Sequence, residues 1–84
     1  MTSEAQNSLA SSLRGQRVRV LEVRGDDALA RRLVDHGLWR GTLVELLTSA
    51  PLGDPMLFSL RGYRLALRRE EAARVMVEPA SREP

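Results

Sequence analysis

The chain has 84 residues, of which 43% are hydrophobic and 29% are charged, a composition typical of one small globular domain. It contains no cysteine, which excludes disulfides, thiolate metal sites, iron–sulfur clusters and cysteine nucleophiles. No run of strongly apolar residues exceeds three, so we expect neither a transmembrane helix nor a signal peptide, and we expect a cytoplasmic location.

The net charge at neutral pH is only +2, from 13 basic and 11 acidic residues, and every basic residue is an arginine. These arginines form no basic cluster in the sequence. Because proteins that bind nucleic acid usually carry a basic patch, we expect no nucleic-acid partner.

The predicted domain spans residues 9–78, between a flexible N-terminus of residues 1–8 and a flexible tail of residues 79–84. The sequence before the first strand suggests a single turn anchored by Leu9 and Leu13.

Residues 17–20 alternate between polar and apolar side chains, which predicts a half-buried strand. The alternation continues over residues 21–24 with its phase shifted by one residue. This slip indicates a bulge or a sharp bend near Val20, as small barrels need at their corners.

A short helix is predicted over residues 28–36. Asp27 precedes it as a preferred N-cap residue, and the apolar residues within it fall on one side. Gly37 is the residue expected just after the helix, where Leu33 and Leu38 would make the hydrophobic contact of a Schellman ending.

Three further strands are predicted at residues 42–48, 56–60 and 63–68, joined by a turn segment at 49–55 and a tight turn at 61–62. Alternation over the last two of these strands places six side chains inward: Met56, Phe58, Leu60, Tyr63, Leu65 and Leu67.

One helical turn at residues 69–73 and a fifth strand at residues 75–77 complete the pattern. A sheet this small hides its edges best by closing on itself. We therefore predict a mainly β fold, a small five-stranded SH3-like barrel with one helix inserted between strands 1 and 2. The alternative is an open α+β sheet with the helix on one face.

The chain also carries three motifs in a fixed order. They are Arg32-Leu33 with Gly37-Leu38 and Gly41; Ala50-Pro51-Leu52-Gly53-Asp54-Pro55; and Arg61-Gly62-Tyr63-Arg64-Leu65-Ala66-Leu67-Arg68, followed by Glu71-Ala72 and Val75-Met76-Val77. Their order and spacing resemble the ferrous iron transport protein A (FeoA) family over roughly Leu9 to Val77.

The resemblance implies an SH3-like barrel in the bacterial cytosol. It also implies a non-enzymatic accessory protein that binds the cytosolic side of FeoB, the membrane ferrous-iron permease with a GTPase domain, and modulates its activity. The residues themselves agree with the absence of an enzyme, because the chain has no recognisable catalytic triad and no lysine for a phosphate-binding loop. The alternatives are a small-barrel nucleic-acid binder that uses its arginines and an orphan metal-responsive regulatory domain.

Four residues are predicted to contact a partner. Trp39 lies in a short corner, where its ring either anchors a partner or folds over the open end of the barrel. Pro51 and Leu52 offer a preordered apolar edge. Arg68 either pairs with Glu71 to fix the last turn or contacts the partner. Structural roles are predicted for four glycines: Gly37, Gly41, Gly53 and Gly62.

His36 is the only histidine, and it follows Asp35. Its imidazole either caps the helix end or acts with Asp35 as a metal ligand. One histidine and nearby carboxylates cannot complete a tetrahedral metal site within a single chain. We therefore expect no required cofactor, adventitious binding of a divalent metal such as zinc between two chains, and a monomer or weak dimer.

Overall fold

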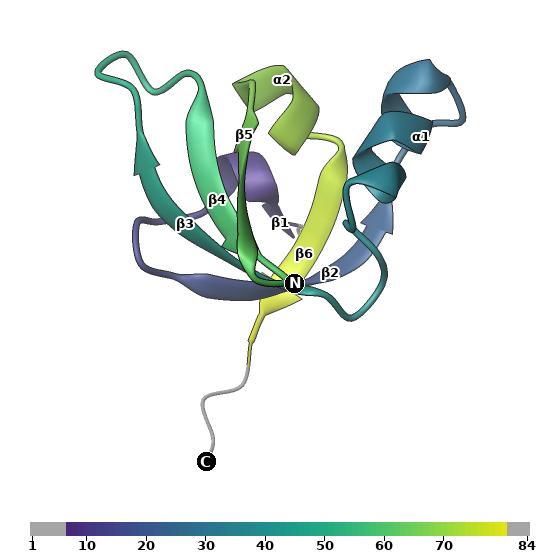
Figure 1. The fold of residues 1–84 in the computed structure, drawn as a ribbon, viewed down its shortest axis with the longest axis horizontal. Helices are drawn as coiled ribbons and strands as arrows, with labels where there is room; N and C mark the ends of the chain where they lie inside the picture. Colours follow the sequence, from purple (N-terminus) through teal and green to yellow (C-terminus); the bar gives the residue numbers. More distant parts are fainter. Residues whose placement is uncertain (1–6, 81–84) are drawn as a thin grey trace, which may run out of the picture.

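In the computed structural model, which describes residues 7–80, a curved antiparallel sheet of six strands is accompanied by three short helices (Figure 1). The sheet order is β1-β6-β2-β3-β4-β5. The strands are β1 (Asn7–Ser8), β2 (Arg17–Val23), β3 (Leu43–Ser49), β4 (Met56–Leu60), β5 (Tyr63–Leu67) and β6 (Val75–Pro79). The helices are the 3-10 helix η1 (Leu9–Ser11) and the α-helices α1 (Ala28–Asp35) and α2 (Arg69–Ala72).

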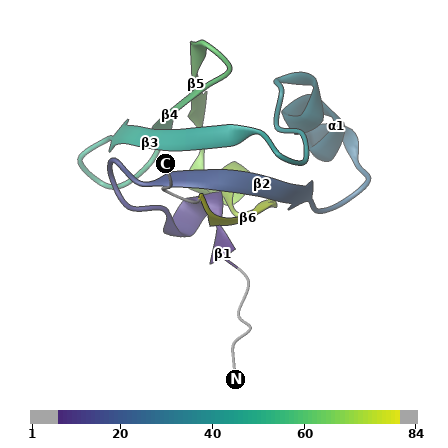
Figure 2. The same ribbon diagram turned by 90° about the horizontal axis from the view of Figure 1, so that it is seen from below.

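The sheet curves from β3, β4 and β5 on one side of the molecule to β6 and β2 on the other (Figure 1). Figure 2 shows β2 and β3 side by side, with the inserted helix α1 at the end where their connection runs. The helix α2 lies between β5 and β6, and η1 packs against both α2 and β6. The helices η1 and α2 thus pack together beside β6. Among residues 7–80, no helix is long and apolar enough to cross a membrane.

All five predicted strands are present, and β1 is an additional one. Asn7 and Ser8 pair with Val77 and Met76 of β6, although two polar residues give no recognisable strand pattern. At the other end, β6 continues to Pro79, so the sheet extends beyond both predicted domain boundaries. The predicted flexible residues 1–6 and 81–84 lie outside the described residues.

The core fills the concave side of the sheet, and Phe58 at its centre is fully buried. The slip in the alternation of the first strand is real, because the β2–β6 register shifts between Val20 and Glu22. Leu9 is fully buried, as predicted, but the prediction for Leu13 is wrong, since 70% of that residue is exposed.

The inward position predicted for Tyr63 is also wrong. Tyr63 is 40% exposed, and its hydroxyl donates a hydrogen bond to the backbone oxygen of His36. Leu65 and Leu67 on the same strand are buried as predicted. Tyr63 is the first residue of β5, so its long side chain can reach past the end of the sheet to α1.

Both ends of α1 are set by local sequence. The Asp27 carboxylate accepts a hydrogen bond from the Ala30 amide, as an N-cap should. At the other end, the amide of Gly37 donates to the Val34 oxygen at 2.9 Å and the amide of Leu38 donates to the Leu33 oxygen at 3.4 Å. These are the two hydrogen bonds of a Schellman ending, and Gly37 takes the left-handed conformation that it requires, with φ 104°.

Replacing Gly37 by alanine should therefore destabilise the protein by about 1–2 kcal/mol. A Cβ atom there would be strained at positive φ and would lie 2.9 Å from the Cδ atom of Arg61. Gly41→Ala is the matched control, because its φ is 91° but nothing lies within 4 Å of the added Cβ. Denaturant midpoints should fall for both variants and fall further for Gly37→Ala; equal losses would mean that the Arg61 contact has no effect on stability.

The stability should also depend on pH through Asp27. The Arg74 guanidinium donates to both Asp27 carboxylate oxygens at 3.0 Å and, with the Ala30 amide, holds the pKa of Asp27 well below its usual value near 4. A lowered folded-state pKa stabilises the protein at pH values above the unfolded-state pKa, and this stabilisation is lost as the pH falls toward the folded value.

Asp27→Asn keeps a capping oxygen but removes the charge. The melting temperature of the wild type should exceed that of Asp27→Asn at pH 7, and the difference should shrink as the pH falls below about 4. A difference that stays constant over this range would exclude the ion pair as its source.

Candidate partner-binding site

Four of the six exposed large hydrophobic residues within residues 7–80 gather at one end of the barrel. The loop from α1 to β3 meets the β4–β5 turn there, because the start of β3 pairs with the end of β4. We call this region the corner surface and define it by Val34, His36, Trp39, Leu43, Arg61 and Tyr63.

The Trp39 ring is fixed in place while remaining 47% exposed. Its indole Nε1 donates a hydrogen bond of 2.7 Å to the Val34 backbone oxygen in the last turn of α1. The Arg61 guanidinium lies over its face, with Cζ 4.1 Å from the ring centroid, close enough for a cation–π interaction. An aromatic ring that is already ordered loses little conformational entropy when a partner covers it.

Arg61 occupies an unusual backbone position. Its φ is 49°, followed by 86° at Gly62, so the two residues form a two-residue turn with positive φ at both positions. The left-handed conformation costs a non-glycine residue about 1–2 kcal/mol, and the contact with Trp39 offsets part of this. Within the described residues no carboxylate lies within ion-pair distance of Arg61, so its donors remain available to an anionic group.

Further hydrogen bonds hold the corner beneath Trp39. The Tyr63 hydroxyl donates to the His36 oxygen, and the Thr42 hydroxyl donates to the Gly37 oxygen at 3.0 Å. Among residues 7–80, Thr42 is the polar residue that is buried. The corner is therefore fixed by side chains from β5 and from the residue that precedes β3.

The corner surface has the composition of a binding surface. It offers apolar and aromatic area with one unpaired guanidinium, a combination that suits an apolar partner surface carrying an anionic group. His36, which belongs to this surface, and its neighbour Asp35 are both exposed. Over residues 7–80, no group of three or more His, Cys, Asp or Glu side chains could hold a metal ion.

The structure does not bring Pro51 and Leu52 to the corner surface. They follow β3 whereas Trp39 precedes it, and a strand of seven residues is roughly 20 Å long. Leu52 is 94% exposed in the loop between β3 and β4. The predicted partner-binding residues therefore lie at opposite ends of the barrel.

The expected pair between the Arg68 and Glu71 side chains is absent from the structure. Instead, the backbone amide of Arg68 donates to Glu71 Oε1 at 2.8 Å and caps α2. The other carboxylate oxygen of Glu71 lies 3.5 Å from an Arg32 guanidinium nitrogen, which links α2 to α1. No ion pair of the Arg68 guanidinium occurs among the described residues.

Arg69, which the sequence analysis did not single out, links three distant segments. Its guanidinium donates to the Gly53 oxygen at 3.0 and 3.2 Å and to the Ala10 oxygen at 2.8 Å. Its backbone amide donates to the Asp54 carboxylate at 2.9 Å. In the sequence, Ala10 lies 59 residues from Arg69, Gly53 lies 16 residues away and Asp54 lies 15 residues away. No local sequence signal could have revealed these contacts.

The four glycines with predicted structural roles all have positive φ: Gly37, Gly41, Gly53 and Gly62. At Gly53 an added Cβ would lie 3.1 Å from Nη2 of Arg69, so a side chain there would crowd the guanidinium that links the three segments.

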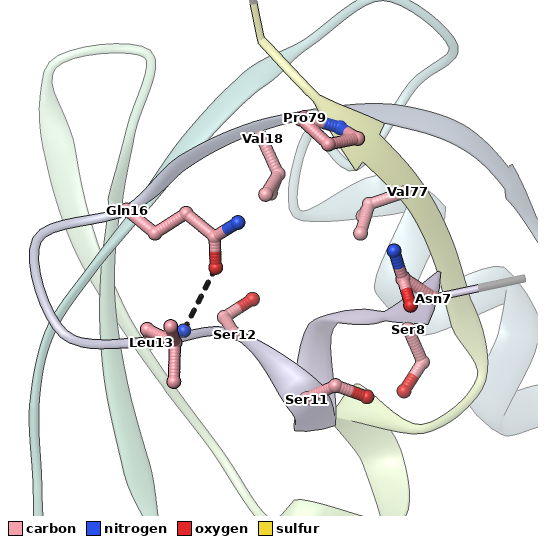
Figure 3. Close-up of a pocket in the computed structure, with 9 residues that line it drawn as sticks. All are labelled: Asn7, Ser8, Ser11, Ser12, Leu13, Gln16, Val18, Val77 and Pro79. Atoms are coloured by element: carbon pink, nitrogen blue, oxygen red, sulfur yellow. Dashed lines mark hydrogen bonds between the residues drawn. The ribbon is translucent and has the colours of Figure 1, made fainter.

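A small cavity of about 200 Å³ lies between η1 and the ends of β2 and β6 (Figure 3). The Gln16 side chain reaches toward it and accepts a hydrogen bond from the Leu13 amide at 2.9 Å, while Val18 and Val77 form an apolar wall. The Ser12 hydroxyl is buried there without a hydrogen-bond partner. Among the described residues that line the cavity, none carries a charged side chain.

Comparison with known proteins identifies relatives of this chain. The FeoA domain model matches residues 8–79. The Fe(2+) transport protein A/Fe(2+) transporter FeoB fusion protein of Porphyromonas gingivalis is 31% identical over 64 residues, covering 76% of this chain and 8% of that protein. The chain thus corresponds to a small part of that relative's length.

Solved structures agree with this match. The solution structure of the FeoA-like protein from Clostridium acetobutylicum has a TM-score of 0.84 and 32% identity, and the match covers 100% of this chain and 95% of that chain. The crystal structure of Stenotrophomonas maltophilia FeoA complexed with zinc, described as a procaryotic SH3 domain protein, has a TM-score of 0.77 and 33% identity, with 86% and 89% covered. The predicted SH3-like fold is confirmed, with one strand more than expected.

The three-way contact of Arg69 predicts a stability effect. Arg69→Met should lower the free energy of unfolding by about 1–2 kcal/mol, because the Ala10 and Gly53 oxygens lose charged hydrogen-bond donors. Arg68→Met is the matched control and should change the free energy of unfolding by less than about 0.5 kcal/mol. Chemical denaturation measures both, and similar values for the two variants would show that the Arg69 hydrogen bonds do not stabilise the fold.

Proposed function

The chain belongs to the FeoA domain family, and from this premise we propose that it is a non-enzymatic cytoplasmic accessory protein of ferrous-iron uptake. It binds the cytosolic side of the ferrous-iron permease FeoB, in the region of its GTPase domain, and modulates the permease. Neither catalysis nor a bound cofactor is part of this role.

The fused relative supports the proposed partner. In the Porphyromonas gingivalis protein, Fe(2+) transport protein A and the transporter FeoB are parts of one polypeptide. Fusion keeps two domains at a high effective concentration, so a contact between them needs only modest intrinsic affinity. A separate chain must obtain the same contact from its own surface.

The corner surface is the observation that carries the proposal. Its Trp39 ring is half exposed. The indole N–H donates to the Val34 backbone oxygen, and the Arg61 guanidinium lies over the face of the ring. Tryptophan and arginine are the residue types most often found at the energetic centres of protein interfaces. The net charge of +2 is too small for strong electrostatic steering, so affinity comes from these desolvated groups.

Modulation then follows from differential affinity. A domain that binds one conformation of the permease more tightly than another shifts the population toward the first. When the permease is saturated, the free-energy difference between its two conformations changes by the difference in their binding free energies. This mechanism requires no chemistry in the bound domain.

The substitution Trp39→Ala should weaken binding to the detergent-solubilised permease by about 30-fold, which corresponds to roughly 2 kcal/mol. The fold should survive, because the removed ring is half exposed at the surface. Biolayer interferometry measures the affinity, and a melting curve of the variant checks that unfolding remains cooperative.

Leu52→Ala is the matched control, since it removes an exposed apolar side chain from the opposite end of the barrel. We expect it to change the affinity by less than threefold, that is, by less than about 0.7 kcal/mol. If Leu52→Ala weakens binding and Trp39→Ala does not, the apolar loop rather than the corner surface contacts the permease. Failure of the wild-type protein to bind would overturn the proposed function itself.

The proposed independence from metal is tested separately. A chelator should leave the melting temperature of dilute protein unchanged, because no metal cluster occurs within residues 7–80. Zinc at high protein concentration should produce dimers that His36→Ala abolishes. A fall in melting temperature with chelator, or zinc dimers that persist in His36→Ala, would reveal a metal site elsewhere.

A further inference from the structure

The strand β5 forms an outer edge of the sheet. It pairs with β4 on one side only, and in the described part of the chain no strand pairs with its other side. The β4–β5 ladder is regular over all five pairs and has no bulge. β5 also contains no proline, so its outer edge is open to pairing.

The tight turn defines which backbone groups face outward. In a two-residue hairpin the residues flanking the turn, here Leu60 and Tyr63, form a hydrogen-bonded pair. Hydrogen-bonded and non-hydrogen-bonded pairs then alternate, so the amides and carbonyls of Arg64 and Ala66 point away from β4. Within residues 7–80 these four groups have no other hydrogen-bond partner, and both residues are exposed.

The same edge is lined with positive charge. Arg61 precedes β5, Arg64 lies within it and Arg68 follows it, and all three are exposed. None of them lies within ion-pair distance of a carboxylate among the described residues. Unpaired arginines along an open strand edge favour an acidic segment over a neutral one.

The charge also disfavours a second copy of this chain on the same edge. Two β5 strands paired in antiparallel fashion would bring the arginines of both copies to one seam, where like charges repel. An extended acidic segment satisfies both the backbone groups and the guanidinium groups. A segment of five residues would run about 17 Å, from the corner surface toward Arg68.

We propose that an acidic, extended segment of the permease adds to β5 as a further strand of the sheet, pairing with the backbone of Arg64 and Ala66. The proposal rests on the proposed function, because it assigns the binding mode of that partner.

The test is hydrogen exchange by mass spectrometry on the protein alone and with intact detergent-solubilised permease. In the free protein, the amides of Arg64 and Ala66 should exchange fast while those of Tyr63, Leu65 and Leu67 are protected. Binding should add protection equivalent to two amides in peptides that cover residues 63–67.

Ala66→Pro removes an amide that β4 does not use, so it should preserve the fold and weaken binding by about tenfold or more. Ala66→Ser keeps the amide and should bind as the wild type does. Arg64→Glu should also weaken binding by about tenfold, because it places a negative charge opposite the acidic segment. Melting curves of each variant establish that the fold is intact; if Ala66→Pro unfolds, the exchange result and Arg64→Glu decide the question.

The outcomes separate this inference from the proposed function. If the permease binds but leaves the amides of residues 63–67 unprotected, or if Arg64→Glu binds as tightly as the wild type, β5 is not the docking edge and only this inference fails. If the permease does not bind the wild type at all, the proposed function and this inference both fail.

Discussion

The carbonyl groups at the C-terminal end of α1 organise much of the molecule. The last carbonyls of a helix have no partners within the helix, and a buried or half-buried helix end must find them elsewhere. Here the chain reverses at Gly37, and the oxygens of Val34, His36 and Gly37 accept hydrogen bonds from the side chains of Trp39, Tyr63 and Thr42. The need of one short helix for hydrogen-bond donors at its C-terminal end thus positions Trp39, Tyr63 at the start of β5, and Thr42 just before β3.

The sequence predicted those elements whose signals are local. The N-cap aspartate and the glycine that follows α1 act within a few residues of the helix, and the alternation of the strands reports burial on one side of a sheet. Even the bulge in β2 is visible as a change of phase, because an extra residue moves the buried positions by one.

The features that the sequence did not predict depend on contacts between distant residues. Tyr63 fits the alternation of its strand, but it lies at the end of β5. There its hydroxyl donates to the backbone oxygen of His36 after α1, and its ring does not enter the core. β1 has only two residues and exists because β6 provides a pairing edge. Arg69 donates to residues of η1 and of the β3–β4 loop, and neither partner is recognisable without the fold.

The candidate site was predictable only in part for the same reason. Trp39 is recognisable in the sequence by residue type and position. Its contact with Arg61, however, depends on the left-handed backbone conformation of Arg61 in the β4–β5 turn. The sequence does not show whether Pro51 and Leu52 share a face with Trp39, and in the structure their loop and the corner surface lie at the two ends of the barrel.

The three acceptors that fix the corner surface are all main-chain oxygens, and two of them belong to Val34 and His36, which do not have the positive φ of Gly37. Any residue compatible with the helix supplies the same oxygen atom, so a change of side chain at Val34 or His36 leaves the anchors of Trp39 and Tyr63 in place. The placement of Trp39 and Tyr63 therefore depends on the path of the backbone rather than on the side chains of Val34 and His36. Relatives with quite different residues at these two positions can hold the same two rings in place, and a search by side-chain identity there would overlook them.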